Sequence, residues 1–341
     1  DVTREIDVIE EVIRIYGYNN IPSLSDSKTH YPEKNIKSYE SINNIIVNQL
    51  IGLGFNEVVN NSIISPTSNN FKKQIEESKL VDILNPIGTE ISQMRNSLLF
   101  GLLENISYNL KRQEQNIKIF ETGKVYLNDK GEFIENKYVS ISLTGDFYDQ
   151  NWIYNNQPDI FFKMKGIVNS ILVKLGFNKC EEVFVNKNMF EDSIEFRLGG
   201  KLIAMVGTVN LKILNHFDIH QQVAYAELEL NKIFDFYSNK KFKVSPIRQF
   251  PFSKRDYAIM IDNDVDFNSL KEKSLKISGK LLYKIDLFDV YNGKELPKNK
   301  KSYGISFYFY NKEKTITDSE INIICNKLEK MFIDSFGAEL R

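Results

Sequence analysis

The sequence predicts an α+β protein in which antiparallel sheets are flanked by helices. Three observations predict this class. Segments of helical and of strand periodicity do not alternate in a regular βαβ order, short turns separate many neighbouring strand-like segments, and polar stretches divide the chain. The 341 residues, 42% of them hydrophobic and 26% charged, are typical of two or three globular domains. No apolar run approaches the roughly 18 residues of a membrane span.

The first 21 residues are expected to contain one helix, over 3–17. Its apolar residues recur at the spacing of one helix face, and a glycine follows them: Ile9, Val12, Ile13, Tyr16 and Gly17. Residues 22–35 contain two prolines and few apolar side chains, which predicts a linker. Because the chain does not begin with Met, we expect it to belong to a longer protein.

Residues 36–237 are expected to form a larger folded region. Helices are predicted over 36–53, 91–112 and 162–175, and strands over 56–65, 117–126, 138–144, 194–198, 202–209 and 223–230. The helix over 91–112 is too rich in leucine for one buried stripe. It is central in the core, a contact with another subunit, or both, and the candidate contact residues are Arg95, Leu98, Leu99 and Leu102.

Residues 246–341 follow a basic connector over 238–245 and form a second region. The pattern predicts a strand, a helix, two strands and a helix, over 257–261, 267–277, 281–290, 303–310 and 319–336. A capping-box sequence, TDSE at 317–320, begins the last helix. This order of elements is that of the ferredoxin-like fold, which carries many functions.

Charge is divided unevenly between the two regions. Residues 1–238 carry 24 Lys+Arg against 31 Asp+Glu, a balance of −7, whereas residues 239–341 carry 20 against 14, a balance of +6. The basic excess predicts an anionic partner for the last region, and a solvated basic surface is the alternative. Cys180 and Cys325 match no metal or disulfide spacing, which favours a reducing compartment such as the cytoplasm.

Cations and aromatic side chains alternate in the last region. The candidate RNA-binding cations are Arg248, Lys254, Arg255, Lys294, Lys298, Lys300 and Lys301, and the aromatic residues among them are Phe250, Phe252, Phe288 and Tyr291. Unpaired bases of RNA stack on aromatic rings while cations hold the phosphates. The alternative is that the aromatic side chains are buried, that the lysines only solubilise the protein, and that Arg255 pairs internally with Asp256.

Four acidic residues near the start of the chain are candidate magnesium ligands. On a helix Asp7, Glu10 and Glu11 share one face, and Asp1 lies about a turn and a half earlier. Magnesium prefers such oxygen ligands and retains several waters. The alternative is a solvated acidic face, on which Arg4 and Arg14 form ion pairs at helical spacing.

Three long stretches resemble one family. FPFSKRDYAIMID (250–262) and IDLFDVYNGKELPKNKKSYGISFYFYNKEKTITDSEIN (285–322), with the final GAELR, resemble the ferredoxin-fold anticodon-binding domain of the bacterial phenylalanyl-tRNA synthetase beta subunit. LNPIGTEISQMRNSLLFGLLENISYN (84–109) and IKIFETGKVY (117–126) resemble its class II synthetase-like core. DVTREIDVIEEVIRIYGYNNIP resembles the tail of its B5 domain. One departure is Asn210-Leu211, where the family commonly has His-Pro.

The resemblance implies the domains, partners and cofactor. Residues 1–21 correspond to the tail helix of the B5 domain, 36–237 to a non-catalytic synthetase-like core, and 246–341 to the anticodon-binding domain. It implies Mg²⁺ at Asp1, Asp7, Glu10 and Glu11. It also implies tRNA(Phe) and a catalytic alpha subunit that binds ATP and phenylalanine in a cytoplasmic (αβ)₂ heterotetramer.

The chain is expected to lack catalytic residues of its own. A class II synthetase binds ATP through a Phe-Arg-x-Glu strand and a Gly-x-Gly-x-x-Arg helix start. Phe196-Arg197 is followed by Leu198-Gly199, and the glycine motif is absent from the sequence. Without those cations, charge that develops during adenylate formation is not stabilised. Two alternatives remain open at this point: a stand-alone magnesium-dependent enzyme that uses the N-terminal acids, and a general RNA-binding protein.

Overall fold

The computed structural model describes residues 2–22, 38–66, 79–88, 91–146, 159–240, 244, 246–293 and 296–340. The chain divides into two compact units, Asp1–Phe242, which we call the larger unit, and Lys243–Arg341, the smaller unit. Each unit has its own hydrophobic core. Among the described residues, no helix is long and apolar enough to span a membrane.

The first helix, α1 (Glu5–Tyr16), is bounded by signals that can be read in the sequence, and it confirms the helix predicted over 3–17. The backbone N–H of Arg4 donates to the Asp7 carboxylate at 3.0 Å, which satisfies a donor at the helix N-terminus. Gly17, at φ 93°, ends the helix and donates its N–H to the carbonyl of Ile13. A short 3₁₀ helix, η1 (Tyr18–Asn20), follows.

A seven-stranded sheet is the centre of the larger unit. Its strands lie in the order β1 (Asn56–Glu57), β4 (Ile117–Asp129), β5 (Glu132–Thr144), β9 (Val223–Glu229), β8 (Lys201–Val209), β7 (Phe190–Leu198) and β6 (Glu181–Phe184). β1 runs parallel to β4, and every other neighbouring pair is antiparallel. The predicted α+β class with an antiparallel sheet is therefore confirmed.

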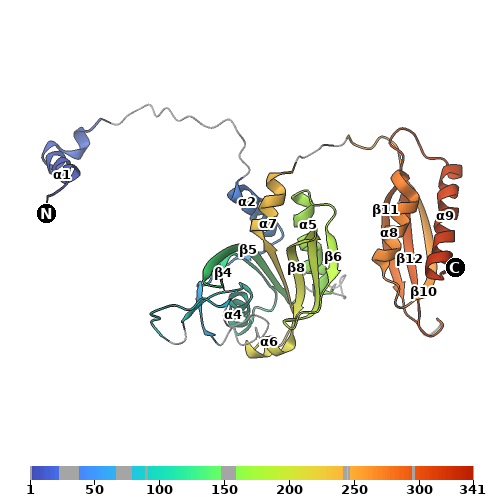
Figure 1. The fold of residues 1–341 in the computed structure, drawn as a ribbon, viewed down its shortest axis with the longest axis horizontal. Helices are drawn as coiled ribbons and strands as arrows, with labels where there is room; N and C mark the ends of the chain where they lie inside the picture. Colours follow the sequence, from blue (N-terminus) through green and yellow to red (C-terminus); the bar gives the residue numbers. More distant parts are fainter. Residues whose placement is uncertain are drawn as a thin grey trace. The chain divides into compact units, whose positions relative to one another are not determined.

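Helices cover both faces of this sheet (Figure 1). Apolar side chains of α2 (Tyr39–Gly52), α5 (Ile160–Lys174) and α7 (Leu230–Ser238) pack into one core on the first face. Those of α4 (Leu99–Leu110) and α6 (Leu211–His216) pack into a second core on the other face. Strand side chains alternate between the two cores, as the period of a strand requires.

Two sequence predictions in this unit were wrong at their boundaries. The helix predicted over 91–112 begins only at Leu99, and Gln93–Met94 is instead a short strand, β3, paired with β2 (Ile63–Ile64). The strand predicted over 56–65 is accordingly split into β1 and β2. The backbone of Arg95 bonds to other segments at its N–H and at its C=O, so it is not available to a helix. The prediction also missed α6, α7 and β6.

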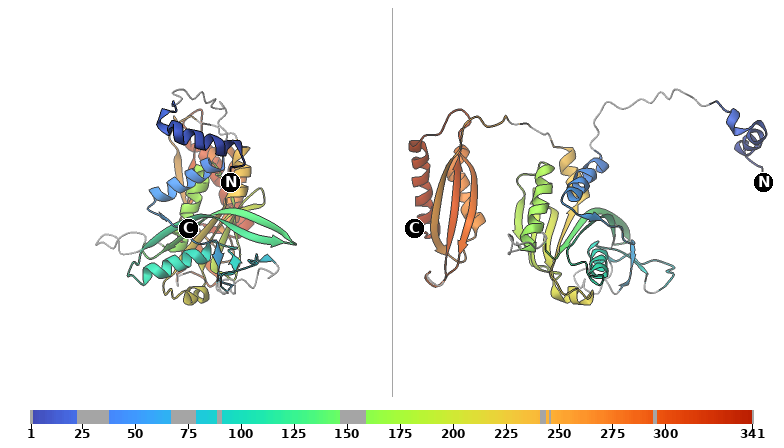
Figure 2. Two further views of the ribbon diagram at one scale, coloured as in Figure 1. Left: turned by 90° about the vertical axis from the view of Figure 1, so that its left-hand side faces the viewer. Right: turned by 180° about the vertical axis from the view of Figure 1, so that it is seen from behind.

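The smaller unit is a four-stranded antiparallel sheet with two helices. Its elements in chain order are β10 (Ser253–Asp262), α8 (Phe267–Ser278), η3 (Gly279–Leu281), β11 (Leu282–Tyr291), β12 (Lys300–Phe309), α9 (Asp318–Phe336) and β13 (Glu339–Leu340). The strands lie in the order β11-β12-β10-β13, which is that of a ferredoxin-like fold. α8 and α9 contact each other and share one core on the same side of the sheet. Figure 2 shows the two helices together with the strands of this unit.

The start of α9 has the predicted capping box. The Thr317 hydroxyl accepts the N–H of Glu320, and the Glu320 carboxylate accepts the N–H of Thr317 at 3.0 Å. The ammonium of Lys314 lies 2.7 Å from that carboxylate. Together Lys314 and Thr317 lower the pKa of Glu320 to about 2 from an ordinary value of 4.5.

This pKa predicts a pH dependence for the first turn of α9. The folded-state pKa lies below the unfolded one, so the stabilisation is fully present above pH 4.5 and is lost as the pH falls towards 2. We expect the protection of amides at the start of α9, that is, their exchange rates relative to the intrinsic rate at each pH, to decrease across this window in the native chain. The Glu320→Gln variant should show a flatter dependence, and equal slopes in the two proteins would contradict the expectation.

Candidate nucleic-acid interface

Among the described residues of the smaller unit, both helices lie on one face of the sheet, and no helix lies on the other face. The side chains of Tyr303, Ile305, Phe307 and Phe309 alternate along β12 towards the helices. The residues that alternate with them are small or aromatic and point to the other side: Ser302, Gly304, Ser306 and Tyr308. We call this side the open face, and its aromatic and cationic members are Phe252, Lys254, Lys284, Phe288, Tyr291 and Tyr308.

The ring of Phe288 lies across the middle of the open face. A Cβ atom at Gly304 would lie 2.7 Å from this ring, so only glycine leaves room for it. The Phe288 side chain is nevertheless 60% exposed, and that of Phe252 is 50% exposed. Phe252 meets Tyr308 edge to face, with 5.4 Å between ring centroids. The flat faces of these aromatic rings are therefore exposed to solvent, although such rings are usually buried in a hydrophobic core.

Two lysines stand among these rings. The ammonium of Lys254 lies 5.8 Å from the centroid of Phe288, and that of Lys284 lies 5.6 Å from the centroid of Tyr308. Lys254 also pairs with Asp256 at 3.0 Å, and Lys284 with Asp286 at 2.6 Å. The hydrogen bonds to these carboxylates raise the pKa of both lysines, so both remain cationic at neutral pH.

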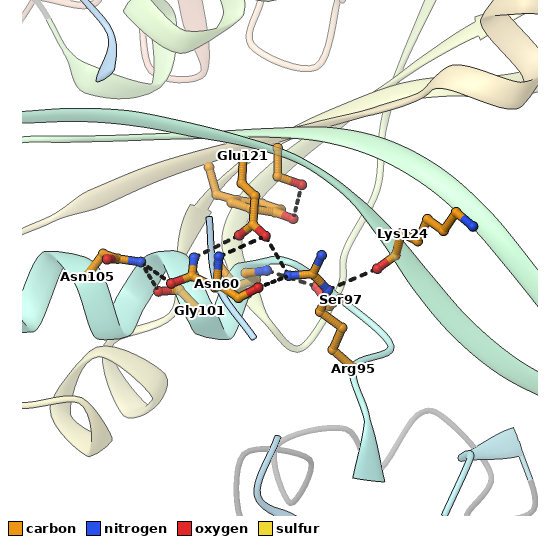
Figure 3. A network of polar contacts seen from close by, with 10 residues as sticks. Asn60, Arg95, Ser97, Gly101, Asn105, Glu121 and Lys124 are labelled. Atoms are coloured by element: carbon orange, nitrogen blue, oxygen red, sulfur yellow. Dashed lines mark hydrogen bonds and ion pairs between the residues drawn. The ribbon is translucent and has the colours of Figure 1, made fainter. Parts of the chain in front are cut away.

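A second polar cluster lies inside the larger unit, between α4 and the sheet (Figure 3). The guanidinium of Arg95 lies 2.5 Å from the Glu121 carboxylate and donates to the carbonyl of Lys124 at 2.9 Å. The side-chain amide of Asn60 donates to Glu121 at 2.7 Å, and that of Asn105 donates to Asn60 at 2.6 Å. Arg95 and Glu121 are only 6% and 1% exposed, so the charge of each is compensated by that of the other.

The two units match different family models. Residues 25–230 match the model described as phenylalanyl tRNA synthetase beta chain CLM domain. Residues 248–341 match the ferredoxin-fold anticodon binding domain. The chain belongs to the phenylalanyl-tRNA synthetase beta chain family.

Curated members of this beta chain family align with the whole chain. The phenylalanine–tRNA ligase beta subunit of Porphyromonas gingivalis is 32% identical over 356 residues, and that of Bacteroides thetaiotaomicron is 33% identical over 355. Each alignment covers 100% of this chain and 43% of the relative, so the chain spans less than half the length of these relatives. A solved structure of pyrrolysyl tRNA synthetase from Desulfitobacterium hafniense aligns with a TM-score of 0.48 at 16% identity, over 58% of this chain and 68% of that chain.

The structure gives different partners to the cations that were predicted from the sequence to bind RNA. Arg248 lies 3.7 Å over the ring of Tyr283. Arg255 pairs internally, as one alternative predicted, but its partner is Asp318 at 2.6 Å and not Asp256, which pairs with Lys254. Lys300 pairs with Glu339 at 2.5 Å, and Lys301 donates to the carbonyl of Asn263 at 2.7 Å. Lys298 is exposed, and Lys294 lies outside the described residues.

Lys284 and Tyr308 were missed as members of the open face. Their signal in the sequence is alternation: along β12, every second residue from Tyr303 is large and apolar, and Tyr308 falls between them. Lys284, on β11, pairs with Tyr308 on β12. A bulge between Leu282 and Lys284 determines this register. A bulge changes which residues share a face, so strand period alone does not place Lys284.

The four residues predicted as a subunit contact are buried within this chain. Leu98, Leu99 and Leu102 are at most 1% exposed, and Arg95 is held by Glu121. Their burial supports the core interpretation, and a contact of this region with another subunit stays a prediction. The close approach of Arg95 to the sheet also requires Gly123, where a Cβ atom would clash with the guanidinium.

Two of the described N-terminal acids, Asp7 and Glu11, form ion pairs on α1. The Asp7 carboxylate lies 2.9 Å from the guanidinium of Arg4, which lowers the pKa of Asp7, and Glu11 lies 3.0 Å from Arg14. Glu10 is exposed. Within the part of the chain that the structure describes, no three His, Cys, Asp or Glu residues are grouped to hold a metal. Asp1 lies outside that part, so the four-acid magnesium site stays a prediction.

Proposed function

We propose that the chain is the C-terminal part of a phenylalanine–tRNA ligase beta subunit and binds tRNA during ATP-dependent phenylalanylation. The observation that carries this proposal is the open face, which exposes aromatic rings beside cations on a ferredoxin-like unit. The match of residues 248–341 to an anticodon-binding family supports tRNA as the anionic partner. The family matches favour this function over a general RNA-binding protein, and no group of metal-holding residues on the described part of the chain favours a stand-alone magnesium enzyme.

The open face suits unpaired bases of an anticodon loop. The exposed rings of Phe288 and Phe252 offer stacking surfaces, and Lys254 and Lys284 supply charge for the adjoining phosphates. The carboxylates of Asp256 and Asp286 hold the two ammonium groups at the sheet surface. Stacking together with phosphate contacts binds single-stranded RNA with little dependence on which base is present.

The larger unit is proposed to scaffold the catalytic alpha subunit. The buried cation on the α4 side of the sheet, Arg95, is neutralised by Glu121 and so is not available to a triphosphate. ATP and phenylalanine would accordingly be bound by the alpha subunit, in a cytoplasmic (αβ)₂ assembly. Since the α4 leucines are buried, the contact with that subunit must use other, exposed residues.

Co-expression with a catalytic alpha subunit tests the scaffold proposal. We expect the two chains to co-purify and the pair to charge tRNA(Phe), whereas the chain alone charges none. Separate elution of the two chains at micromolar concentration would overturn this part of the proposal. A calorimetric titration with Mg²⁺, repeated on the Asp7→Asn variant, tests the magnesium prediction, and heats that are equal in the two proteins would refute it.

The salt dependence of tRNA binding tests the open face. Removing one lysine that neutralises a phosphate reduces the slope of log K against log [salt] by roughly 0.7–0.9. Replacing Lys254 and Lys284 with Gln is therefore expected to reduce the slope by about 1.4–1.8. Replacing Lys298, Lys300 and Lys301 together tests the hairpin predicted from the sequence, and an unchanged slope there would reject that patch.

The matched control removes two charges from the helical side of the same unit. Lys327 and Lys330 are both exposed on α9, whose buried side packs on the opposite face of the sheet. The Lys327→Gln/Lys330→Gln variant has the same net charge as Lys254→Gln/Lys284→Gln. An equal decrease of slope in the two double variants would mean that net charge, and not the open face, determines binding.

A further inference from the structure

A cavity of about 760 Å³ opens on the larger unit, away from the α4 network. It is lined by residues that follow α5, by the β7–β8 turn and by α7. Its volume lies within the range of small-molecule sites in proteins, roughly 300–1,000 Å³. Nothing in the proposed scaffold role uses this cavity, which belongs to a different unit from the open face.

The rim of the cavity is basic although the surrounding region is acidic. Four lysines and one acidic residue line it: Lys179, Lys201, Lys232, Lys240 and Asp235. Residues 1–238, which contain all of these except Lys240, carry 24 Lys+Arg against 31 Asp+Glu. Positive charge is therefore gathered at this cavity against the balance of the region, which favours an anionic ligand.

The four lysines are not equally available to a ligand. Lys232 pairs with Glu229 at 2.6 Å, and Lys240 donates to the carbonyl of Gly176 with its ammonium 4.6 Å from the centroid of Phe177. Lys179 and Lys201 are exposed and make no ion pair with any residue that the structure describes. These two ammonium groups can move to a phosphate without breaking an ion pair to the part of the chain that the structure describes.

The inner wall of the cavity is apolar and partly aromatic. Leu198, Phe177 and Phe236 contribute to it. Phe177 is packed into the core, being 4% exposed, whereas Phe236 is only partly buried against it. An aromatic wall beneath a cationic rim fits a ligand that has both a flat ring and a phosphate.

We propose that this cavity binds a nucleotide, with its phosphate at Lys179 and Lys201 and its base against Phe236 and Leu198. A simple carboxylate or inorganic phosphate would make no contact with the apolar wall. A neutral aromatic compound would make no ion pair with the lysines of the rim. Asp235, the acidic residue of the lining, can accept hydrogen bonds from ribose hydroxyls or a base amino group. The nucleotide is either free or part of an RNA strand, since both present the same chemistry.

Calorimetric titration of the full chain tests the proposal with four probes: AMP, adenosine, inorganic phosphate and a five-nucleotide single-stranded RNA. We expect AMP to bind more tightly than adenosine and than phosphate. The Lys179→Gln/Lys201→Gln variant should weaken AMP binding at least fivefold and leave adenosine binding within twofold. Competition between the RNA and AMP would identify an RNA strand as the source, and binding of AMP without competition by the RNA would identify a free nucleotide.

The control variant removes two exposed lysines elsewhere on the same unit, Lys130 in the β4–β5 turn and Lys212 on α6. Lys130→Gln/Lys212→Gln should leave AMP binding within twofold of the native chain. The proposal is overturned if AMP does not bind, if phosphate binds as tightly as AMP, or if the two double variants weaken AMP binding equally. None of these variants alters the open face, so their outcome is independent of the anticodon proposal.

Discussion

The Arg95→Ala variant is expected to lose about 3–5 kcal/mol of unfolding free energy in the larger unit. Removing the guanidinium leaves the Glu121 carboxylate, which is 1% exposed, without its ion-pair partner. The backbone N–H and the side-chain amide of Asn60 remain bonded to Glu121, but two neutral donors do not compensate a buried charge. Hydrogen exchange of β4 and β5 amides across a urea series measures the loss in this unit separately from the other.

The control is an exposed ion pair between β4 and β5, the two strands whose amides are measured. Lys124 and Glu135 lie 2.5 Å apart, yet their side chains are 44% and 51% exposed. Replacing Glu135 with Gln should cost at most about 1 kcal/mol, because solvent screens the pair. The Arg95→Met/Glu121→Leu double variant should recover much of the loss of Arg95→Ala, since it leaves no unpaired buried charge. A loss for Arg95→Ala no larger than that for Glu135→Gln would contradict the assigned role of the pair.

The Phe288→Ala variant is expected to weaken tRNA(Phe) binding by roughly five- to 150-fold, the effect of losing about 1–3 kcal/mol of base stacking. Its ring is 60% exposed, so the stability of the smaller unit should change little. Filter binding at one fixed salt concentration gives the dissociation constants. Far-ultraviolet circular dichroism checks that the variant is folded.

Phe133 provides the matched control for this variant. It is 70% exposed on β5 of the larger unit and belongs to no proposed RNA surface. Phe133→Ala should leave the dissociation constant within twofold of the native value. If Phe288→Ala also remains within twofold, the open face is not the stacking surface.

The helices and most strands could be predicted because their signals are local. Gly17 ends α1, and the Thr317–Glu320 box starts α9, as their sequences indicate. The start of α4 could not be predicted in this way. Residues 91–98 have apolar content compatible with a helix, but the backbone of Arg95 bonds to segments more than 30 residues away on either side. Such distant hydrogen bonds have no periodic signal in the sequence.

For the candidate sites, too, the sequence predicted the types of residue, and the folded chain decided which of them lie together. The sequence indicated that cations and aromatic residues concentrate after residue 238, and family resemblance assigned them to RNA. Of the hairpin cations, Lys300 and Lys301 bond to Glu339 and Asn263, which come from other parts of the unit. Lys284 joined the open face only through the bulge in β11.

The sequence by itself determined the α+β class, the ferredoxin-like order of the last region, the charge division and the family. These depend on local periodicity, on composition and on motifs that a single chain displays in order. The tertiary structure alone decided which side chains are available to a partner. It buried Arg95 and the α4 leucines, exposed Phe288 above Gly304, and gathered Lys179 and Lys201 at one cavity. Burial and charge pairing depend on contacts between distant segments, and these are fixed only when the chain folds.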